Sequence, residues 1–255
     1  MKIVMFARVP GWYSFHQDRL ARRFQAEGHE IVGIVAEKTK TLATLREWMH
    51  KLGPRVMIQK IFKRLVAGGS TEQAHASSVH RIVDYPPCDA RVYRVASHNS
   101  EECLEIVRKL QPEVLVLRGC LVIRNHILQV PKFGTINPHY ALLPAYRGME
   151  VTEWSVLHGD PCAVSVHWVL DVVDTGGVIT SRLIDVKRGD SLGDLREKCA
   201  ALAVDLLVEA LRKIDVDKIR PAAVSSSGGR QYFVMHPRLY QLAEQRLRLH
   251  HKIGN

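Results

Sequence analysis

The stretch Gly134-Thr-Ile-Asn-Pro-His-Tyr-Ala-Leu-Leu-Pro-Ala-Tyr-Arg-Gly148 runs from apolar residues directly into a polar pair, Asn137 and His139. Its apolar start predicts a buried β-strand that carries both side chains at its end. In an extended chain residues i and i+2 face the same side, so the amide and the imidazole point in one direction. At the carboxyl end of a parallel strand they would lie where ligands bind in open α/β proteins.

The polar pair has two interpretations. An amide beside an imidazole can hydrogen-bond a developing oxyanion while the imidazole moves a proton. Alternatively, Asn137 and His139 only cap a turn before Pro144, which is the commoner role of an isolated Asn-x-His. The long, defined context around the pair favours the chemical interpretation.

Strand-like and helix-like patterns alternate on the N-terminal side of this stretch. Short apolar runs predict strands at Lys2–Ala7, Glu30–Ala36, Arg91–Ala96 and Glu113–Leu117. Asn99 and Glu102 stand three apart, as in a capping box, and predict a helix that reaches about Leu110. Strands separated by helices indicate an α/β fold, with a Rossmann-like, mostly parallel sheet flanked by helices.

The chain after Gly148 predicts a second group of elements. These are strands at Ala163–Leu170 and Val178–Val186 and a long helix, capped by Ser191 and Asp194, that reaches about Ile214. We therefore expect a catalytic domain over residues 1–214 and a short C-terminal extension over residues 215–255. The extension contains a predicted strand, Tyr232–Met235, and a basic helix from Arg238 to about His251.

The chain is strongly basic. It has 36 Lys and Arg against 26 acidic residues, a formal net charge of +10. Such a surface favours anionic partners, such as phosphates, folate glutamates, nucleotides, RNA or a membrane surface, without choosing among them. The basic, amphipathic stretch Thr41–Ala67, which Gly53-Pro54 divides into two predicted helices, either shapes an acceptor site or, more simply, covers the surface.

The sequence lacks the signals of several classes of protein. No segment approaches eighteen consecutive apolar residues, so no transmembrane helix is expected. The five scattered cysteines form no CxxC pair, which argues against a disulfide framework and a structural zinc site and favours a reducing, cytoplasmic setting. Val9-Pro10-Gly11 lacks the three glycines of a dinucleotide fingerprint, and the chain has no P-loop, serine-hydrolase elbow or zinc-protease motif.

The opening stretch resembles the folate-dependent formyltransferase family, whose pattern runs Asn-x-His-x-Ser-Leu-Leu-Pro-x-x-Arg-Gly. The matching residues are Asn137, His139, Leu142, Leu143, Pro144, Arg147 and Gly148, with Ala141 in place of the serine. A second family motif, in which a histidine precedes Asp-x-Gly, is matched by His167, Asp174 and Gly176. The resemblance extends more weakly from Met1 to about Ile214.

This resemblance implies an N-formyltransferase that takes its formyl group from 10-formyltetrahydrofolate and needs no metal. By the same resemblance, Asn137 and His139 stabilise an oxyanion, while Asp174 orients His139 and helps to relay the amine proton. The implied pterin pocket lies in two loops, at Cys120, Leu121, Val122, Leu170, Asp171 and Val172. Leu121 and Val122 fit ordinary core positions equally well.

Three further positions are implied by the resemblance with less definite roles. Tyr146 and Arg147 are implied substrate contacts, and Arg147 either binds an acceptor phosphate or only braces its loop. His167 either supports Asp174 or simply ends a strand.

The acceptor is inferred from the layout of the chain. Val9-Pro10-Gly11 does not resemble the Gly-Ser-Gly phosphate loop of glycinamide ribonucleotide formyltransferases. The residues after the last core helix are too few for the β-barrel of methionyl-tRNA formyltransferases. We therefore expect a small-molecule amine, first of all an amino sugar on a nucleotide carrier, with methionyl-tRNA as the alternative acceptor.

Two alternatives come from other classes of protein. One is a formyltetrahydrofolate hydrolase, and the other is a non-catalytic folate- or RNA-binding relative. Retention of Asn137, His139 and Asp174 argues against a non-catalytic protein. The C-terminal strand and helix are candidates for a homodimer contact.

Overall fold

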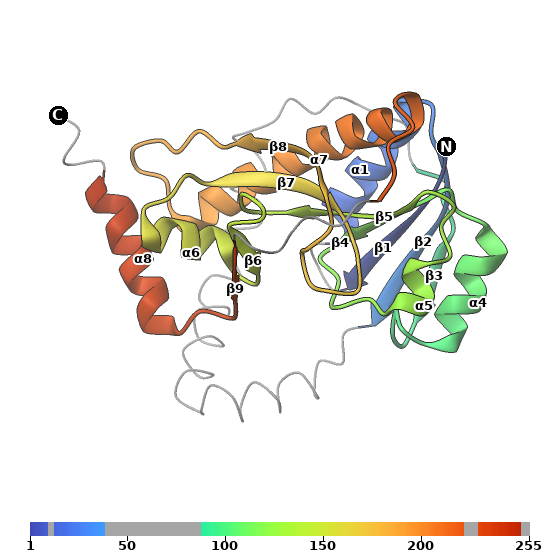
Figure 1. Cartoon of the computed structure of the whole chain (residues 1–255), viewed down its shortest axis with the longest axis horizontal. Helices are drawn as coiled ribbons and strands as arrows, with labels where there is room; N and C mark the ends of the chain where they lie inside the picture. The colour runs from blue at the N-terminus through green and yellow to red at the C-terminus, as the bar shows by residue number, and fades with distance from the viewer. Residues whose placement is uncertain (10–12, 39–87, 222–228, 251–255) are drawn as a thin grey trace.

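A computed structural model describes residues 1–9, 13–38, 88–221 and 229–250 (Figure 1). The two helices predicted within Thr41–Ala67 lie outside these residues. The strands are β1 (Lys2–Val9), β2 (Glu30–Lys38), β3 (Val92–Val95), β4 (Val114–Arg118), β5 (Gly134–His139), β6 (Tyr146–Gly148), β7 (Ala163–Trp168), β8 (Val178–Leu183) and β9 (Arg230–Tyr232). The helices are α1 (Tyr13–Ala26), α4 (Glu101–Leu110), α5 (Asn125–Leu128), α6 (Val151–His158), α7 (Leu192–Val216) and α8 (Pro237–His250).

Seven of these strands form one sheet, in the order β3-β2-β1-β4-β5-β7-β8. The strands from β3 to β5 pair in parallel, whereas β7 runs antiparallel to β5, and β8 runs antiparallel to β7. The prediction of a mostly parallel α/β sheet is therefore confirmed. No helix in the described part of the chain is long and apolar enough to cross a membrane.

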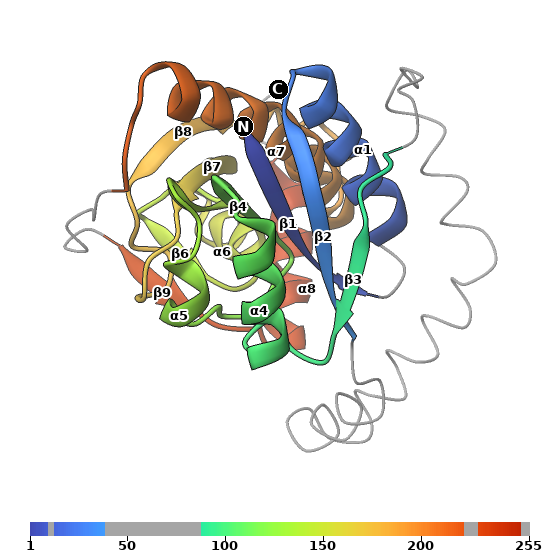
Figure 2. The same ribbon diagram turned by 90° about the vertical axis from the view of Figure 1, so that its right-hand side faces the viewer.

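Both faces of the central parallel strands are buried, and β1 shows how the sequence achieves this. Ile3 and Met5 belong to a core with residues of α1 and α7, while Val4 and Phe6 belong to a second core with residues of α4 and α5. Successive residues of a strand point to opposite faces, so an unbroken apolar run such as this one requires a cover on each side. Figure 2 shows the sheet between these two layers of helices.

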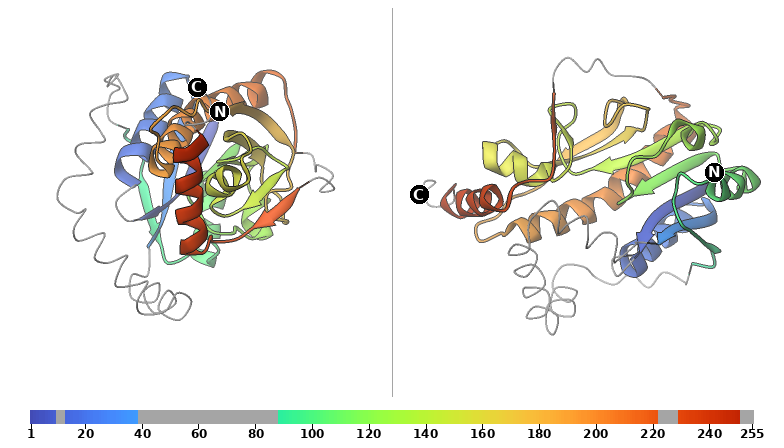
Figure 3. Two further views of the ribbon diagram at one scale, coloured as in Figure 1. Left: turned by 90° about the vertical axis from the view of Figure 1, so that its left-hand side faces the viewer. Right: turned by 90° about the horizontal axis from the view of Figure 1, so that it is seen from below.

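The C-terminal residues pack against β6, α6 and α7 rather than on the parallel strands. β9 pairs with β6 in a second, two-stranded sheet, and α8 lies against α6 at the end of the molecule away from α4 (Figure 3). The predicted strand Tyr232–Met235 is wrong in its bounds, because Phe233 and Met235 bond to side chains instead of a neighbouring strand. The Phe233 carbonyl accepts from the Trp154 indole, and the Met235 amide donates to Glu150.

The predicted helix that reaches about Leu110 is observed as α4, but its capping box is wrong. The N-cap is Ser100, whose hydroxyl accepts the Cys103 amide at 3.3 Å. Asn99 precedes the cap, and its side chain bonds to the loop after β4 instead. Ser and Asn are both good N-caps, so the local sequence does not distinguish the two registers.

Candidate active site

Asn137 and His139 occupy the last residues of β5, at the edge of the sheet where the parallel strands end. Antiparallel pairing with β7 places His167 opposite Asn137 and Ser165 opposite His139. Both histidines are buried, with His139 6% exposed and His167 1% exposed. Two histidines and an amide are thus held together by the register of two neighbouring strands.

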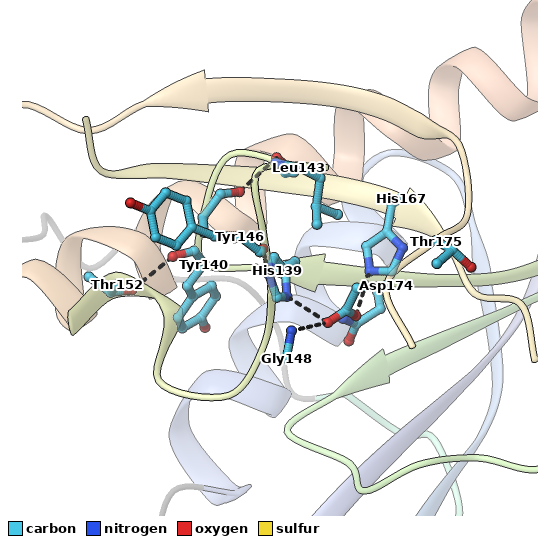
Figure 4. A network of polar contacts seen from close by, with 12 residues as sticks. His139, Tyr140, Leu143, Tyr146, Gly148, Thr152, His167, Asp174 and Thr175 are labelled. Atoms are coloured by element: carbon cyan, nitrogen blue, oxygen red, sulfur yellow. Dashed lines mark hydrogen bonds and ion pairs between the residues drawn. The ribbon is translucent and has the colours of Figure 1, made fainter. Parts of the chain in front are cut away.

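Asp174 lies in the loop between β7 and β8, and its carboxylate faces three elements (Figure 4). One oxygen lies 3.6 Å from Nδ1 of His139, and the other lies 3.5 Å from Nε2 of His167. The Gly148 amide donates a 2.7 Å hydrogen bond to the same carboxylate. Asp174 has a backbone φ of +53°, a left-handed conformation that Asp and Asn adopt more readily than most residues.

Two glycines in the matched motifs are explained by close backbone contacts. A Cβ on Gly148, which has a φ of +100°, would lie 2.1 Å from the Tyr232 carbonyl oxygen of β9. A Cβ on Gly176 would lie 1.8 Å from the Trp168 carbonyl oxygen of β7. Only glycine allows β6 to pass β9 while presenting its amide to Asp174.

The proton positions on His139 follow from its neighbours. Its Nε2 lies 2.7 Å from the Tyr146 carbonyl oxygen, which can only accept, so Nε2 carries a hydrogen. In the neutral ring the lone pair is therefore on Nδ1, the nitrogen that faces Asp174. A proton taken up at Nδ1 would be stabilised at once by this carboxylate.

His167 has the opposite tautomer. Its Nδ1 lies 2.7 Å from the Trp168 carbonyl oxygen and must donate to it, which leaves Nε2 to accept. Nδ2 of Asn137 donates to this Nε2 at 3.3 Å. Burial lowers the pKa of His167 to about 4, against the opposing effect of Asp174, so the ring is neutral near pH 7. His167 therefore bonds to Asn137 and fixes the orientation of its amide.

This arrangement combines an oriented amide donor with a proton acceptor. Asn137 has a second N–H for a developing negative charge, and His139 with Asp174 can take a proton from a nucleophile. Among the residues described, no group of three or more His, Cys, Asp or Glu is arranged to hold a metal ion.

The implied pterin residues lie in two loops beside the core that contains α4 and α5. Cys120, after β4, and Val169, after β7, both pack against this core. Leu121, Val122 and Val172 are 53%, 63% and 61% exposed. Leu121 and Val122 are therefore not core residues. Leu170 is partly buried and Asp171 is exposed.

The two implied substrate residues lie in β6. The Tyr146 ring is buried and stacks on Tyr232 with 5.1 Å between ring centroids, and its hydroxyl bonds to Asp160 and His158. Burial, followed by the bond to Asp160, raises the pKa of Tyr146. Arg147 is partly buried and donates to the Gly229 carbonyl at 3.3 Å, so it joins β6 to the start of β9.

A buried hydroxyl that sequence reasoning missed holds the loop after His139. Ser165 is fully buried, and its Oγ donates to the Ala141 carbonyl at 2.8 Å and accepts the Leu143 amide at 3.2 Å. Ala141, at the position of the family's serine, is also fully buried. Ser165, from the neighbouring strand, therefore holds the loop at Ala141, where the family's serine is absent.

Comparison with known families matches residues 1–211 to the family described as Formyl transferase. The chain belongs to this family. The resemblance found in the two sequence motifs is thereby confirmed, and the family's members transfer formyl groups.

Individual relatives of this formyltransferase family member differ in their acceptors. A methionyl-tRNA formyltransferase from Caldanaerobacter subterraneus subsp. tengcongensis is 32% identical over 125 residues, which cover 48% of this chain and 40% of that protein. A phosphoribosylglycinamide formyltransferase from Anaplasma phagocytophilum has a TM-score of 0.60 at 14% identity, with 92% of this chain and 99% of that chain covered. The formyltransferase PseJ from Anoxybacillus kamchatkensis has a TM-score of 0.50 at 16% identity, with 92% and 86% covered. The two solved structures share the fold of this protein.

The Ser165→Ala substitution should destabilise the protein. It leaves the buried Ala141 carbonyl and Leu143 amide without their partner, which costs about 1–3 kcal/mol. Ser155→Ala is a matched control, because Ser155 is equally buried but donates to the Val151 carbonyl within its own helix, and its loss should cost less than about 1 kcal/mol. Urea denaturation measures both free energies of unfolding, and equal losses would contradict the role of Ser165.

The stability of the protein should fall as pH drops from about 6.5 to about 4. Over this range His167 takes up a proton in the unfolded chain, where its pKa is near 6.5, but not in the folded protein, where burial lowers the pKa to about 4. Urea denaturation at several pH values measures the effect. The His167→Gln variant removes the titrating group, so its stability should depend less steeply on pH, and parallel curves would refute the assignment.

Proposed function

We propose that this protein transfers a formyl group from 10-formyltetrahydrofolate to a primary amine, and that the amine belongs to an amino sugar on a nucleotide carrier or a similar small molecule. The observation that carries the proposal is the convergence on Asp174. Its carboxylate lies within 3.6 Å of both His139 and His167, and His167 in turn orients Asn137.

The surface beside these residues suits the pterin of the donor. Leu121, Val122 and Val172 expose apolar side chains from two loops that flank the same core. A flat, partly apolar ring system can cover such side chains, while the main-chain groups of the loops supply hydrogen bonds. We therefore assign these exposed apolar residues to the wall of the site that binds the pterin. The roles of Cys120, Leu170 and Asp171 are part of the same proposal.

Each catalytic residue has a distinct role in the proposed transfer. Asn137 donates its free amide hydrogen to the formyl oxygen as negative charge develops there. The amine loses a proton as it attacks, and Nδ1 of His139 accepts it beside Asp174. When the tetrahedral intermediate collapses, the bond between the formyl carbon and N10 of the folate breaks, and the proton held by His139 passes to N10, so that the products are tetrahydrofolate and the formamide. The Tyr146 carbonyl and the Gly148 amide hold this pair in place, so that the groups need little reorganisation during the reaction.

Two observations favour a small nucleotide-linked acceptor. PseJ, which shares the fold, was solved with a UDP-linked formamido sugar and tetrahydrofolate. The net charge of +10 also suits a diphosphate carrier. In this proposal Arg147 and Tyr146 belong to the part of the site that binds the acceptor. Methionyl-tRNA is the second candidate, favoured by the 32% identity to an enzyme of that activity, although the match covers less than half of that protein.

The proposed reaction is tested by supplying 10-formyltetrahydrofolate with a panel of amines and following the release of tetrahydrofolate. The panel contains UDP- and dTDP-linked amino sugars, free amino sugars and methionyl-tRNA. We expect release that depends on an amino sugar nucleotide. Release of formate without any amine would identify a hydrolase, and formylation of methionyl-tRNA alone would favour the second candidate.

Substitutions at Asp174 and His139 should remove the reaction without unfolding the protein. Asn tolerates the left-handed backbone and can still accept the Gly148 amide, so Asp174→Asn keeps the structure but loses the negative charge beside His139. We expect kcat to fall by about 100-fold or more in Asp174→Asn and His139→Ala. Unchanged kcat in either variant, with thermal unfolding as the control for folding, would show that the assignment is wrong.

A further inference from the structure

Asn99 joins the start of α4 to the loop that follows β4. Its Nδ2 donates to the Val122 carbonyl at 2.9 Å, and its Oδ1 accepts the Arg124 amide at 2.7 Å. A carbonyl can only accept and an amide N–H can only donate, so these two contacts fix the orientation of the Asn99 amide. One side chain thus bonds to the main chain on both sides of Ile123.

The bonded loop needs such support, because its residues belong to no helix or strand between Arg118 and Asn125. Ile123 is buried in the core that contains α4 and α5, but Leu121 and Val122 on its N-terminal side are more than half exposed. Packing therefore contributes little to the conformation of these two residues. The hydrogen bond from Asn99 holds the main chain at Val122 itself.

Asn99 is itself held on a rigid base. The preceding residue, His98, is fully buried, and its ring stacks on Phe6 of β1 with 4.5 Å between centroids. His98 also bonds to β2, through its ring to the Val35 carbonyl and through its amide to the Glu37 carboxylate. The Asn99 backbone is therefore tied to the central strands, and Figure 2 shows α4 and α5 side by side on one face of the sheet.

We propose that Asn99 is a positioning residue for the donor: it holds the Cys120–Val122 loop in the conformation that binds the pterin ring of the folate. The inference rests on the proposed function of this loop. Without Asn99, binding the donor would have to order Leu121 and Val122, which weakens affinity without changing the groups that act on the formyl carbon. The effect should therefore appear in KM for 10-formyltetrahydrofolate and in folate affinity, and not in kcat.

The test compares Asn99→Ala with Ser100→Ala. Ser100 is the adjacent residue and caps the same helix, but its hydroxyl bonds to the Ser97 carbonyl and the Cys103 amide rather than to the loop. For Asn99→Ala we expect KM for 10-formyltetrahydrofolate to rise about tenfold, with kcat and KM for the acceptor within about twofold of the wild type. Ser100→Ala should lower the thermal unfolding temperature and leave all three kinetic constants unchanged.

Two further measurements separate positioning from a general structural role. Calorimetric titration with 5-formyltetrahydrofolate, a stable folate probe, should show the same loss of affinity in Asn99→Ala without any acceptor. Hydrogen exchange should be faster at the Arg124 amide in this variant, because its acceptor is removed.

The outcomes distinguish this inference from the proposed function. Folate binding by the wild type with unchanged affinity in Asn99→Ala would overturn the positioning role alone. An equal rise in KM in Asn99→Ala and Ser100→Ala would also overturn it, since the effect would then come from the helix terminus. Absence of folate binding by the wild type would overturn the proposed function and this inference with it.

Discussion

The contacts of the Asp174 carboxylate are the constraint on which the site depends. This carboxylate accepts a hydrogen bond from the Gly148 amide of β6, and it faces one histidine from β5 and another from β7. A carboxylate that is only 13% exposed needs a hydrogen-bond donor, because burial of an unpaired charge is costly, and the Gly148 amide is that donor. The backbone at Asp174 is left-handed, and the glycines at 148 and 176 allow their main chains to approach the carbonyls of Tyr232 and Trp168 closely.

The same carboxylate faces two histidines that differ in function because different carbonyls fix their tautomers. The Tyr146 carbonyl accepts a hydrogen bond from Nε2 of His139, so the basic nitrogen of this ring, Nδ1, points at Asp174. The Trp168 carbonyl accepts a hydrogen bond from Nδ1 of His167, so the basic nitrogen of His167, Nε2, points at Asn137 and Asp174. Burial then keeps His167 neutral. Two hydrogen bonds to main-chain carbonyls thus give the two histidines different roles: His139 accepts the proton in the proposed reaction, and His167 orients the Asn137 amide.

The sequence was sufficient to predict what local patterns determine. Apolar runs predicted the strands of the parallel sheet, and the i, i+2 spacing placed Asn137 and His139 together at the end of β5. The bond between His167 and Asn137 could not be predicted, since it depends on the register of β5 against β7. The role of Ser165 depends on the same register. Asn99 was predicted to cap a helix, because nothing local shows that its side chain reaches a loop more than twenty residues away.

The architecture also explains how a common donor can be combined with different acceptors. The proposed donor loops follow β4 and β7 and rest on the core shared with α4 and α5. On the other side of Asp174, β6 pairs with β9, which comes from the C-terminal part of the chain. Changes in β9 or α8 would leave β5 and the donor loops untouched, provided that Gly148 keeps its bond to Asp174. The proposed acceptor side can therefore diverge among relatives while the groups that act on the formyl carbon stay fixed.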